Sequence, residues 1–201
     1  MKVLVLSPYP QELTGALKLN GDEVDLMMNP MLLLEEKDLP VDWIISYGYR
    51  RRISSWILER FKDRAINLHP SFLPWNRGTY PNLWSWYDDT PKGVTIHQLA
   101  DEIDAGGILA QENVHLNTEH TLKSSYEALQ YRMARLFSSY WPIIRTGKQP
   151  AISQDPGGTS HKKADGEKLV AQLPRVWNTS VIDVIELGKR DRETGRYFSS
   201  Y

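Results

Sequence analysis

The sequence predicts an α/β fold: a Rossmann-like, doubly wound, mostly parallel sheet with a long C-terminal helix and a short irregular tail. Short apolar runs such as residues 2–6 and 41–47 alternate with helical patterns in the first part of the chain. A further apolar run at 65–68 leads into a loop bracketed by Pro70 and Pro74. Because parallel strands need long crossovers, which are usually helices, this alternation indicates one parallel sheet.

The elements of the first half follow from their patterns and stop signals. We expect strands at 2–6, 23–28, 41–47 and 65–68, helices at 11–19 and 54–64, and a short helical or irregular connection at 31–37. Asn20-Gly21 is a good stop for the first helix. The first strand leads into Pro8-Tyr9-Pro10 and not into a G-x-G-x-x-G turn, which argues against a bound NAD or FAD.

The second half contains two strands and three helices by the same criteria. We expect helices at 82–87, from Thr118 or Glu119 to Ile144, and at 181–189, the last capped by Thr179 or Ser180, and strands at 93–99 and 108–116. The two strands should be antiparallel, because too few residues separate them for a crossover. The end of the chain, residues 190–201, is polar and is expected to be loose.

Apolar residues on two of these helices are expected in the core. One group, on the helix at 82–87, is Trp84, Trp86 and Tyr87. The other forms a stripe at three- and four-residue steps along the long helix, namely Leu122, Tyr126, Leu129, Met133, Phe137, Tyr140 and Ile144. Exposed aromatics near Trp84 and Trp141 would leave room for a dimer, so an oligomer is possible.

Composition limits the classes of protein that fit. The 201 residues suit one domain at 1–150 with a short extension at 151–201 packed on it. A formal charge of −1 offers no basic face for a nucleic acid, and the absence of cysteine excludes disulfides and thiolate chemistry. No apolar run approaches the ~20 residues of a membrane span. We therefore expect a cytoplasmic protein without a nucleic-acid or membrane partner, and no metal site is indicated.

Asn67, His69 and Asp104 are the candidate catalytic residues. Asn67 and His69 are two apart at the carboxyl end of a strand, so both side chains point to one face, where ligands of open α/β sheets bind. Together with Asp104, before Gly106-Gly107, they suit acyl transfer to an amine. Asn67 and a protonated His69 would stabilise the oxyanion, and His69 or Asp104 would take the amine proton.

Three ordered motifs resemble the formyltransferase family that uses N10-formyltetrahydrofolate. The matching segments are Asn67-Leu68-His69-Pro70-Ser71 with Leu73-Pro74, Pro91-Lys92-Gly93-Val94-Thr95-Ile96-His97, and Asp101-Glu102-Ile103-Asp104-Ala105-Gly106-Gly107-Ile108-Leu109-Ala110-Gln111. The resemblance implies that the family's Asn-His-Asp trio falls on Asn67, His69 and Asp104. The position after the aspartate is often Thr in the family and is Ala105 here.

The resemblance also implies residues that bind the two substrates. The backbone of Arg51, Arg52 and Ile53 would hold the pterin ring of the folate co-substrate, with Glu102 and Ile103 nearby. The arginine side chains could instead be solvated, or could meet an acidic folate tail or a substrate phosphate. The implied contacts to the amine substrate are Trp75, Asn76, Arg77, Gly78, Tyr80, His97, His161 and Lys162. His97 could equally line the site or make a structural hydrogen bond, and the segment at 155–165 could be a surface turn.

The branch of the family is indicated by Trp75-Asn76-Arg77-Gly78, Asp89-Thr90-Pro91-Lys92-Gly93 and Gly157-Gly158. These segments look like sugar-nucleotide N-formyltransferases, which implies an enzyme that formylates the primary amine of a dTDP- or GDP-linked amino-deoxy sugar destined for a surface polysaccharide such as O-antigen. The alternative is formylation of an aminoacyl group on a peptide-synthetase carrier domain. Glycinamide ribonucleotide and methionyl-tRNA fit less well, and a non-catalytic folate- or nucleotide-binding module is a further alternative.

Overall fold

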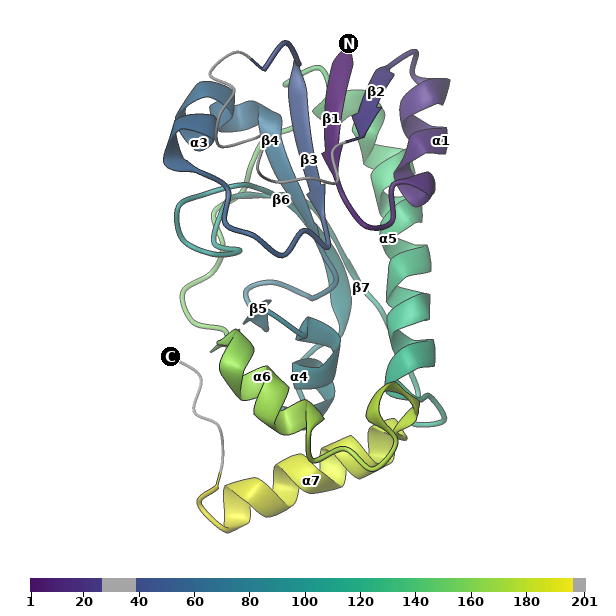
Figure 1. Cartoon of the computed structure of the whole chain (residues 1–201), viewed down its shortest axis with the longest axis vertical. Helices are drawn as coiled ribbons and strands as arrows, with labels where there is room; N and C mark the ends of the chain where they lie inside the picture. The colour runs from purple at the N-terminus through teal and green to yellow at the C-terminus, as the bar shows by residue number, and fades with distance from the viewer. Residues whose placement is uncertain (27–38, 197–201) are drawn as a thin grey trace. The chain divides into compact units, whose positions relative to one another are not determined.

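A six-stranded sheet in the order β2-β1-β3-β4-β6-β7 forms the centre of the fold (Figure 1). The computed structural model describes residues 1–26 and 39–196, so the connection expected at 31–37 lies outside the described residues. The strands are β1 (Lys2–Leu6), β2 (Glu23–Leu26), β3 (Trp43–Tyr47), β4 (Ala65–His69), β6 (Gly93–Gln98) and β7 (Ile108–Asn113). β1 pairs in parallel with β2 and β3, and β3 with β4, which confirms the predicted parallel core.

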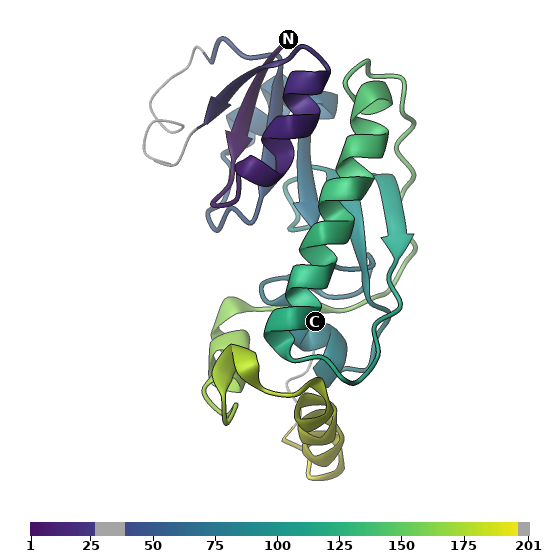
Figure 2. The same cartoon turned by 90° about the vertical axis from the view of Figure 1, so that its right-hand side faces the viewer.

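Helices and a small second sheet complete the architecture (Figures 1 and 2). The helices are α1 (Gln11–Leu19), α3 (Ser55–Phe61), α4 (Pro81–Tyr87), α5 (Leu122–Ile144), α6 (Lys163–Val170) and α7 (Val181–Glu193), with 3-10 turns η1 (Lys62–Arg64) and η2 (Val176–Asn178). The small sheet pairs β5 (Arg77–Gly78) in parallel with β8 (Ser160–His161). The segment expected as loop or surface turn at 155–165 thus contains a strand and the start of α6.

The pairing of β6 with β7 is antiparallel, as expected. Gln98 N donates to Gly107 O at 2.9 Å, and Val114 N donates to Lys92 O at 2.9 Å. These bonds join residues in opposing order, the pattern of an antiparallel pair.

The chain divides into two compact units. Unit 1 comprises Met1–His69, Ile96–Ala110 and Ala134–Ser153, and unit 2 comprises Pro70–Thr95, Gln111–Met133 and Gln154–Tyr201. The boundary predicted near residue 150 lies close to the point between Ser153 and Gln154 where the chain last passes from unit 1 to unit 2. The predicted division into a domain at 1–150 and an extension at 151–201 stays a prediction.

In unit 1, helices cover both faces of the parallel strands. Leu4 and Ile44 face one side and pack in a buried cluster with Ile57 and Phe61 of α3. Trp43 faces the opposite side, as alternation along a strand requires, and its ring lies 5.4 Å from that of Trp141. This two-sided burial explains why the strands are apolar throughout and confirms the doubly wound fold.

In unit 2, α4 supplies the core and α7 covers it. Trp84, Trp86 and Tyr87 are buried in one cluster with Val181 and Val184 of α7, as predicted for the aromatic group. Trp84 and Trp141 are themselves 0% exposed, whereas Tyr140, the neighbour of Trp141, is 38% exposed, and the expectation that such aromatics leave room for a dimer stays a prediction.

The long helix begins later than expected. α5 starts at Leu122, because Asn117 makes a local turn by accepting from Glu119 N, and Thr121 then acts as the cap. Thr121 Oγ1 accepts from Ser124 N while Ser124 Oγ accepts from Thr121 N, a reciprocal arrangement like a capping box.

Two further expectations about the helices need correction. Tyr140 is 38% exposed, and Trp141 takes the buried position at that level of α5, because it lies four residues after buried Phe137 and three before buried Ile144. Residues 190–193, which were expected to be loose, are helical, because α7 continues to Glu193, four residues beyond the predicted end at Lys189. It is held there because buried Asp191 accepts from Tyr87 Oη at 3.0 Å. Ser180 is the cap, accepting from Ile182 N.

No helix within residues 1–26 and 39–196 has both the length and the apolar character needed to cross a membrane.

Asp22 ties α5 to the parallel strands and gives a test of the packing in unit 1. Its buried carboxylate accepts from Trp141 Nε1 at 2.7 Å and from Arg145 Nη2 at 2.5 Å. Burial raises the pKa of Asp22, but the hydrogen bonds from Arg145 and Trp141 outweigh it and hold the pKa below its usual value. A lowered pKa means that the stabilisation is complete above pH ~4 and is lost as the pH falls through the lowered value.

We expect Asp22→Asn to lower the free energy of unfolding at pH 7 by about 2–4 kcal/mol, since the half-buried Arg145 guanidinium loses its buried, charged partner. Urea unfolding would measure it, with Asp25→Asn, an exposed acid on β2, as the control. The gap between Asp22→Asn and wild type should narrow below pH ~4. Equal stability at pH 7 would contradict this account.

Candidate active site

The carboxyl end of β4 positions Asn67 and His69. Pairing with β3 aligns Ser46 with Asn67 and Tyr47 with Leu68, so both strands end at the same edge of the sheet. The carboxyl ends of parallel strands are where open α/β sheets bind ligands. His69 is buried and Asn67 is half-buried at this edge.

Asp104 reaches these residues from the loop between β6 and β7. Its backbone is in the left-handed region, with φ of +53°. Two residues later, a Cβ on Gly106 would lie 1.9 Å from Gln98 O, so only glycine allows the loop to press against β6 this closely. The Gly-Gly pair therefore brings the aspartate back over the strand ends.

The predicted trio converges on the Asp104 carboxylate. Asn67 Nδ2 donates to Asp104 Oδ1 at 3.1 Å, and His69 Nδ1 lies 3.5 Å from Oδ2. His97 joins them, with its Nε2 3.5 Å from Asp104 Oδ1 and 3.2 Å from Asn67 Nδ2. The Asp104 side chain keeps 12% exposure while that of His97 keeps 1%, so Asp104 is open to solvent and His97 is enclosed.

The hydrogen bonds of His97 fix its tautomer. A backbone carbonyl can only accept, so Nδ1, 2.8 Å from Gln98 O, must carry a proton. The Asn67 amide nitrogen can only donate, so Nε2 must be the acceptor. His97 thus makes hydrogen bonds within the protein, and its role as a substrate contact stays a prediction.

The side-chain nitrogen of Asn67 has hydrogen-bond partners for both of its hydrogens. One Nδ2 hydrogen goes to Asp104 and the other to His97. An ionised carboxylate would repel the amide oxygen, so this orientation of the amide is the stable one. The expected role of Asn67 Nδ2 at an oxyanion would require it to exchange one of these partners, and this role stays a prediction.

The residues predicted to hold the folate also lie in unit 1. Arg51, Arg52 and Glu102 are exposed, and Ile53 is half-buried against the core cluster beside α3. Ile103 is 63% exposed although it is a large aliphatic residue next to Asp104. Arg51 and Arg52 form no ion pair with any other described residue, and their roles stay predictions.

Among the residues predicted to contact the amine substrate, Asn76 and His161 are buried and have protein partners. Asn76 Nδ2 donates to Thr90 Oγ1 at 2.8 Å, and Asn76 N donates to Thr159 Oγ1 at 2.8 Å. His161 Nε2 lies 2.8 Å from Asp88 Oδ2, and its ring stacks on Trp84 at 3.9 Å. Both residues thus fasten the β5–β8 pair inside unit 2.

The other predicted substrate residues are more open. Trp75, Arg77 and Tyr80 are half-buried, and Lys162 is exposed immediately before α6. A Cβ on Gly78, at φ +95°, would lie 2.4 Å from His161 O, so glycine is needed where β5 meets β8. These residues and His161 belong to unit 2, whereas His97 lies with the trio in unit 1.

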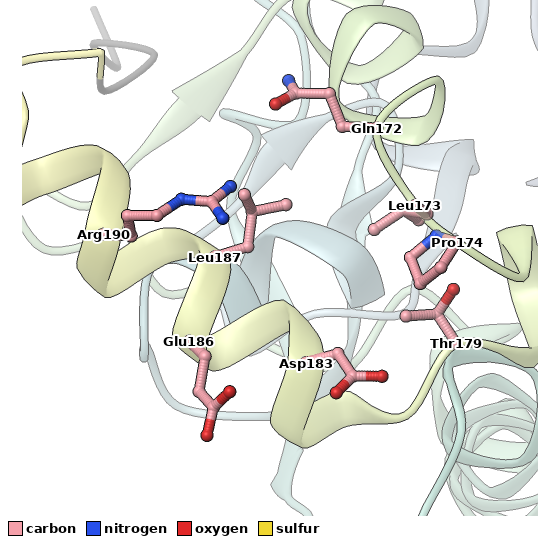
Figure 3. Close-up of a pocket in the computed structure, with 8 residues that line it drawn as sticks. All are labelled: Gln172, Leu173, Pro174, Thr179, Asp183, Glu186, Leu187 and Arg190. Carbon is pink, nitrogen blue, oxygen red and sulfur yellow. The ribbon is translucent and has the colours of Figure 1, made fainter.

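Unit 2 contains a separate cavity of about 320 Å³ beside α7 (Figure 3). It is lined by Gln172, Leu173, Pro174, Thr179, Asp183, Glu186, Leu187 and Arg190. Figure 3 shows Glu186 and Arg190 pointing away from each other, so the charges do not converge on one ligand group. None of the predicted site residues lines this cavity.

Sequence reasoning missed Gln154, which binds the Arg77 guanidinium, and Asp88, the partner of His161. Neither is in a motif, and pairing across 73 or more residues gives no local signal. The exposed Trp177 was also missed, since a lone tryptophan in a polar stretch has no periodicity to mark it.

Comparison with known proteins agrees with this geometry. The sequence matches the formyl transferase family over residues 22–139. A match of this extent covers more than half of the chain, and the chain therefore belongs to the formyl transferase family.

Two relatives with named substrates are similar to this chain in sequence. One solved structure, the formyltransferase PseJ from Anoxybacillus kamchatkensis in complex with UDP-4,6-dideoxy-4-formamido-L-AltNAc and tetrahydrofolate, shares 44% identity. The TM-score is 0.85, with 92% of this chain and 97% of that chain covered. A dTDP-4-amino-4,6-dideoxyglucose formyltransferase from Mycobacterium tuberculosis is 31% identical over 64% of this chain and 54% of its own length. The chain thus spans about half the length of the curated relatives it matches.

A more distant likeness concerns the fold alone. A sugar N-formyltransferase from Shewanella has 22% identity and a TM-score of 0.72, with 85% of this chain and 80% of that chain covered.

The tautomer of His97 is directly measurable. In ¹⁵N-histidine-labelled protein at neutral pH, we expect the His97 resonances to show a protonated Nδ1 and an unprotonated Nε2, because Gln98 O and Asn67 Nδ2 dictate this form. His97→Gln, which lacks the ring, assigns the signals. Protonation at Nε2 would contradict the network around Asp104.

Proposed function

We propose that this chain transfers the formyl group of N10-formyltetrahydrofolate to the primary amine of a nucleotide-linked amino-deoxy sugar. The observation that carries the proposal is the convergence of Asn67, His69 and His97 on the Asp104 carboxylate. The proposal places the reaction in the cytoplasm and needs two small-molecule substrates.

The chemistry follows from the positions of these groups. The amine nitrogen attacks the formyl carbon, which gives a tetrahedral carbon with an oxyanion. The bond from that carbon to N10 then breaks, the amine nitrogen loses a proton, and N10 gains one. Asp104, the partly exposed carboxylate, is suited to take the amine proton directly or through water, and His69 to stabilise the oxyanion and protonate N10.

Support for the donor comes from the surface around Asp104. Ile103 presents an aliphatic side chain to solvent next to Asp104, which would suit contact with a flat apolar ligand. A reduced pterin or the p-aminobenzoyl ring of a folate has this character. The PseJ structure contains tetrahydrofolate, which supports a folate donor for a chain that is 44% identical to it.

The names of the relatives reduce the number of candidate acceptors. PseJ was solved with a UDP-linked 4-formamido sugar, and the mycobacterial relative is named for a dTDP-linked 4-amino sugar. We therefore propose a 4-amino-4,6-dideoxy sugar as the acceptor, and we add UDP to the dTDP and GDP that the sequence suggests.

The test is an acceptor panel with N10-formyltetrahydrofolate as the donor. Its members are UDP-, dTDP- and GDP-linked 4-amino sugars, a dTDP-linked 3-amino sugar and an aminoacyl carrier domain. We expect mass spectrometry to show one formyl group on a 4-amino nucleotide sugar. Formylation of the carrier domain alone would replace the proposal by its alternative, and no formylation of any acceptor would overturn it.

His69→Ala tests the catalytic assignment. Loss of a general acid or base should slow turnover by about 10²–10⁴-fold, while folate binding should stay within a few-fold, because the imidazole acts on the reacting atoms. Rates and folate affinity would be measured separately on both variants, with His115→Ala, an exposed histidine outside the site, as the control. Undiminished turnover in His69→Ala would refute the mechanism.

A further inference from the structure

Gln111 ends the third matching motif of the sequence, yet the proposed reaction gives it no role. The residue is half-buried on β7, and its side-chain nitrogen donates to Leu73 O at 2.8 Å and to Thr95 Oγ1 at 2.9 Å. A backbone carbonyl can only accept, so the amide nitrogen of Gln111 must face Leu73. Gln111 therefore holds a segment that precedes it by 38 residues.

Thr95 binds the same segment from β6. Its hydroxyl donates to Ser71 O at 2.7 Å, and it accepts from Leu73 N at 3.3 Å as well as from Gln111. A hydroxyl has one hydrogen and two lone pairs, so these three bonds use its full capacity. Thr95 is 0% exposed and Ser71 and Leu73 are buried as well, so water does not compete for these groups.

The segment held in this way is the loop at 70–75, which follows β4 directly. The loop lies outside the helices and strands, so its buried backbone groups need partners from elsewhere in the chain. Thr95 and Gln111 supply them for Ser71 O, Leu73 N and Leu73 O. Two side chains on neighbouring strands thus set the conformation of the loop.

His69 is joined to this loop by a single peptide bond. A residue before proline is confined to extended backbone conformations, and the ring of Pro70 fixes its own φ. Few free torsions therefore separate the His69 backbone from the Ser71 carbonyl that Thr95 holds. A shift of the loop would be passed to the His69 imidazole, whose Nδ1 lies 3.5 Å from Asp104 Oδ2.

From these contacts we infer that Gln111 and Thr95 are positioning residues for His69. The inference rests on the proposed function, because it gives a part in that reaction to two groups that do not touch the reacting atoms. They hold the loop, and the loop holds the backbone that carries the imidazole. Displacement of a catalytic group by about 1 Å can slow a reaction on the order of 100-fold, so the effect belongs in kcat.

The first test compares Gln111→Leu with a matched control, Gln149→Leu. Gln149 Nε2 donates to Leu109 O at 2.7 Å, a bond of the same kind to a backbone carbonyl of β7 that does not involve the loop. With the nucleotide sugar that the acceptor panel identifies, Gln111→Leu should lower kcat about 10–100-fold and leave KM for the folate within about three-fold. Gln149→Leu should keep the kcat of wild type.

A second pair of variants tests the hydroxyl of Thr95. Thr95→Val has nearly the same shape without the hydroxyl, so it should lower kcat as Gln111→Leu does. Thr95→Ser keeps the hydroxyl and with it the three hydrogen bonds, so it should restore kcat to within about three-fold of wild type. Circular dichroism would verify that each variant is folded at the assay temperature.

A nuclear magnetic resonance measurement tests the same inference without turnover. In ¹⁵N-histidine-labelled protein, the His69 side-chain signals, identified with His69→Ala, should shift in Gln111→Leu and stay at their wild-type positions in Gln149→Leu. Wild-type kcat or unshifted His69 signals in folded Gln111→Leu would overturn the positioning role, and so would an equal loss of kcat in Gln149→Leu. A wild type that formylates no acceptor would overturn the proposed function alone, and the His69 signals would then decide whether Gln111 positions this residue.

Discussion

The Asp104 carboxylate is the constraint on which the candidate active site depends. It fixes the orientation of the Asn67 amide, whose nitrogen lies 3.2 Å from His97 Nε2. Each of these groups is placed by a different part of unit 1: a strand end, the next strand, and a loop that glycine allows to approach the backbone closely. A single acidic side chain therefore contacts two imidazoles and one amide.

The parallel sheet and the trio could be read from the sequence because their signals are local. The apolar runs of β1, β3 and β4 are continuous, since both faces of these strands are covered. Asn67 and His69 share a face through strand geometry alone. The position of Asp104 is harder to predict from spacing, because it depends on the turn after β6. Its place in the trio was inferred from the resemblance to the formyltransferase family.

The errors concern features that depend on distant partners. The late start of α5 follows from a side-chain turn at Asn117 and a cap at Thr121, where several polar residues compete for the same role. The extension of α7 from Lys189 to Glu193 was missed, because it depends on the contact of Asp191 with Tyr87 of α4, which no local pattern reveals. The contact of His161 with Asp88 and its stacking on Trp84 were not predicted, because they are formed across more than 70 residues, and its role as a substrate contact stays a prediction.

The discontinuous make-up of unit 2 has a consequence for how the protein folds. Its core joins Trp84 to Val181 and Val184, so nearly a hundred intervening residues separate side chains that pack together. Long loops of this kind must close before their contacts stabilise anything, which slows folding. During synthesis on the ribosome α4 lacks its α7 neighbours until α7 has emerged. Completion of this core is thus a late event, and Trp84 waits for its contacts with α7 while nearly a hundred residues are translated.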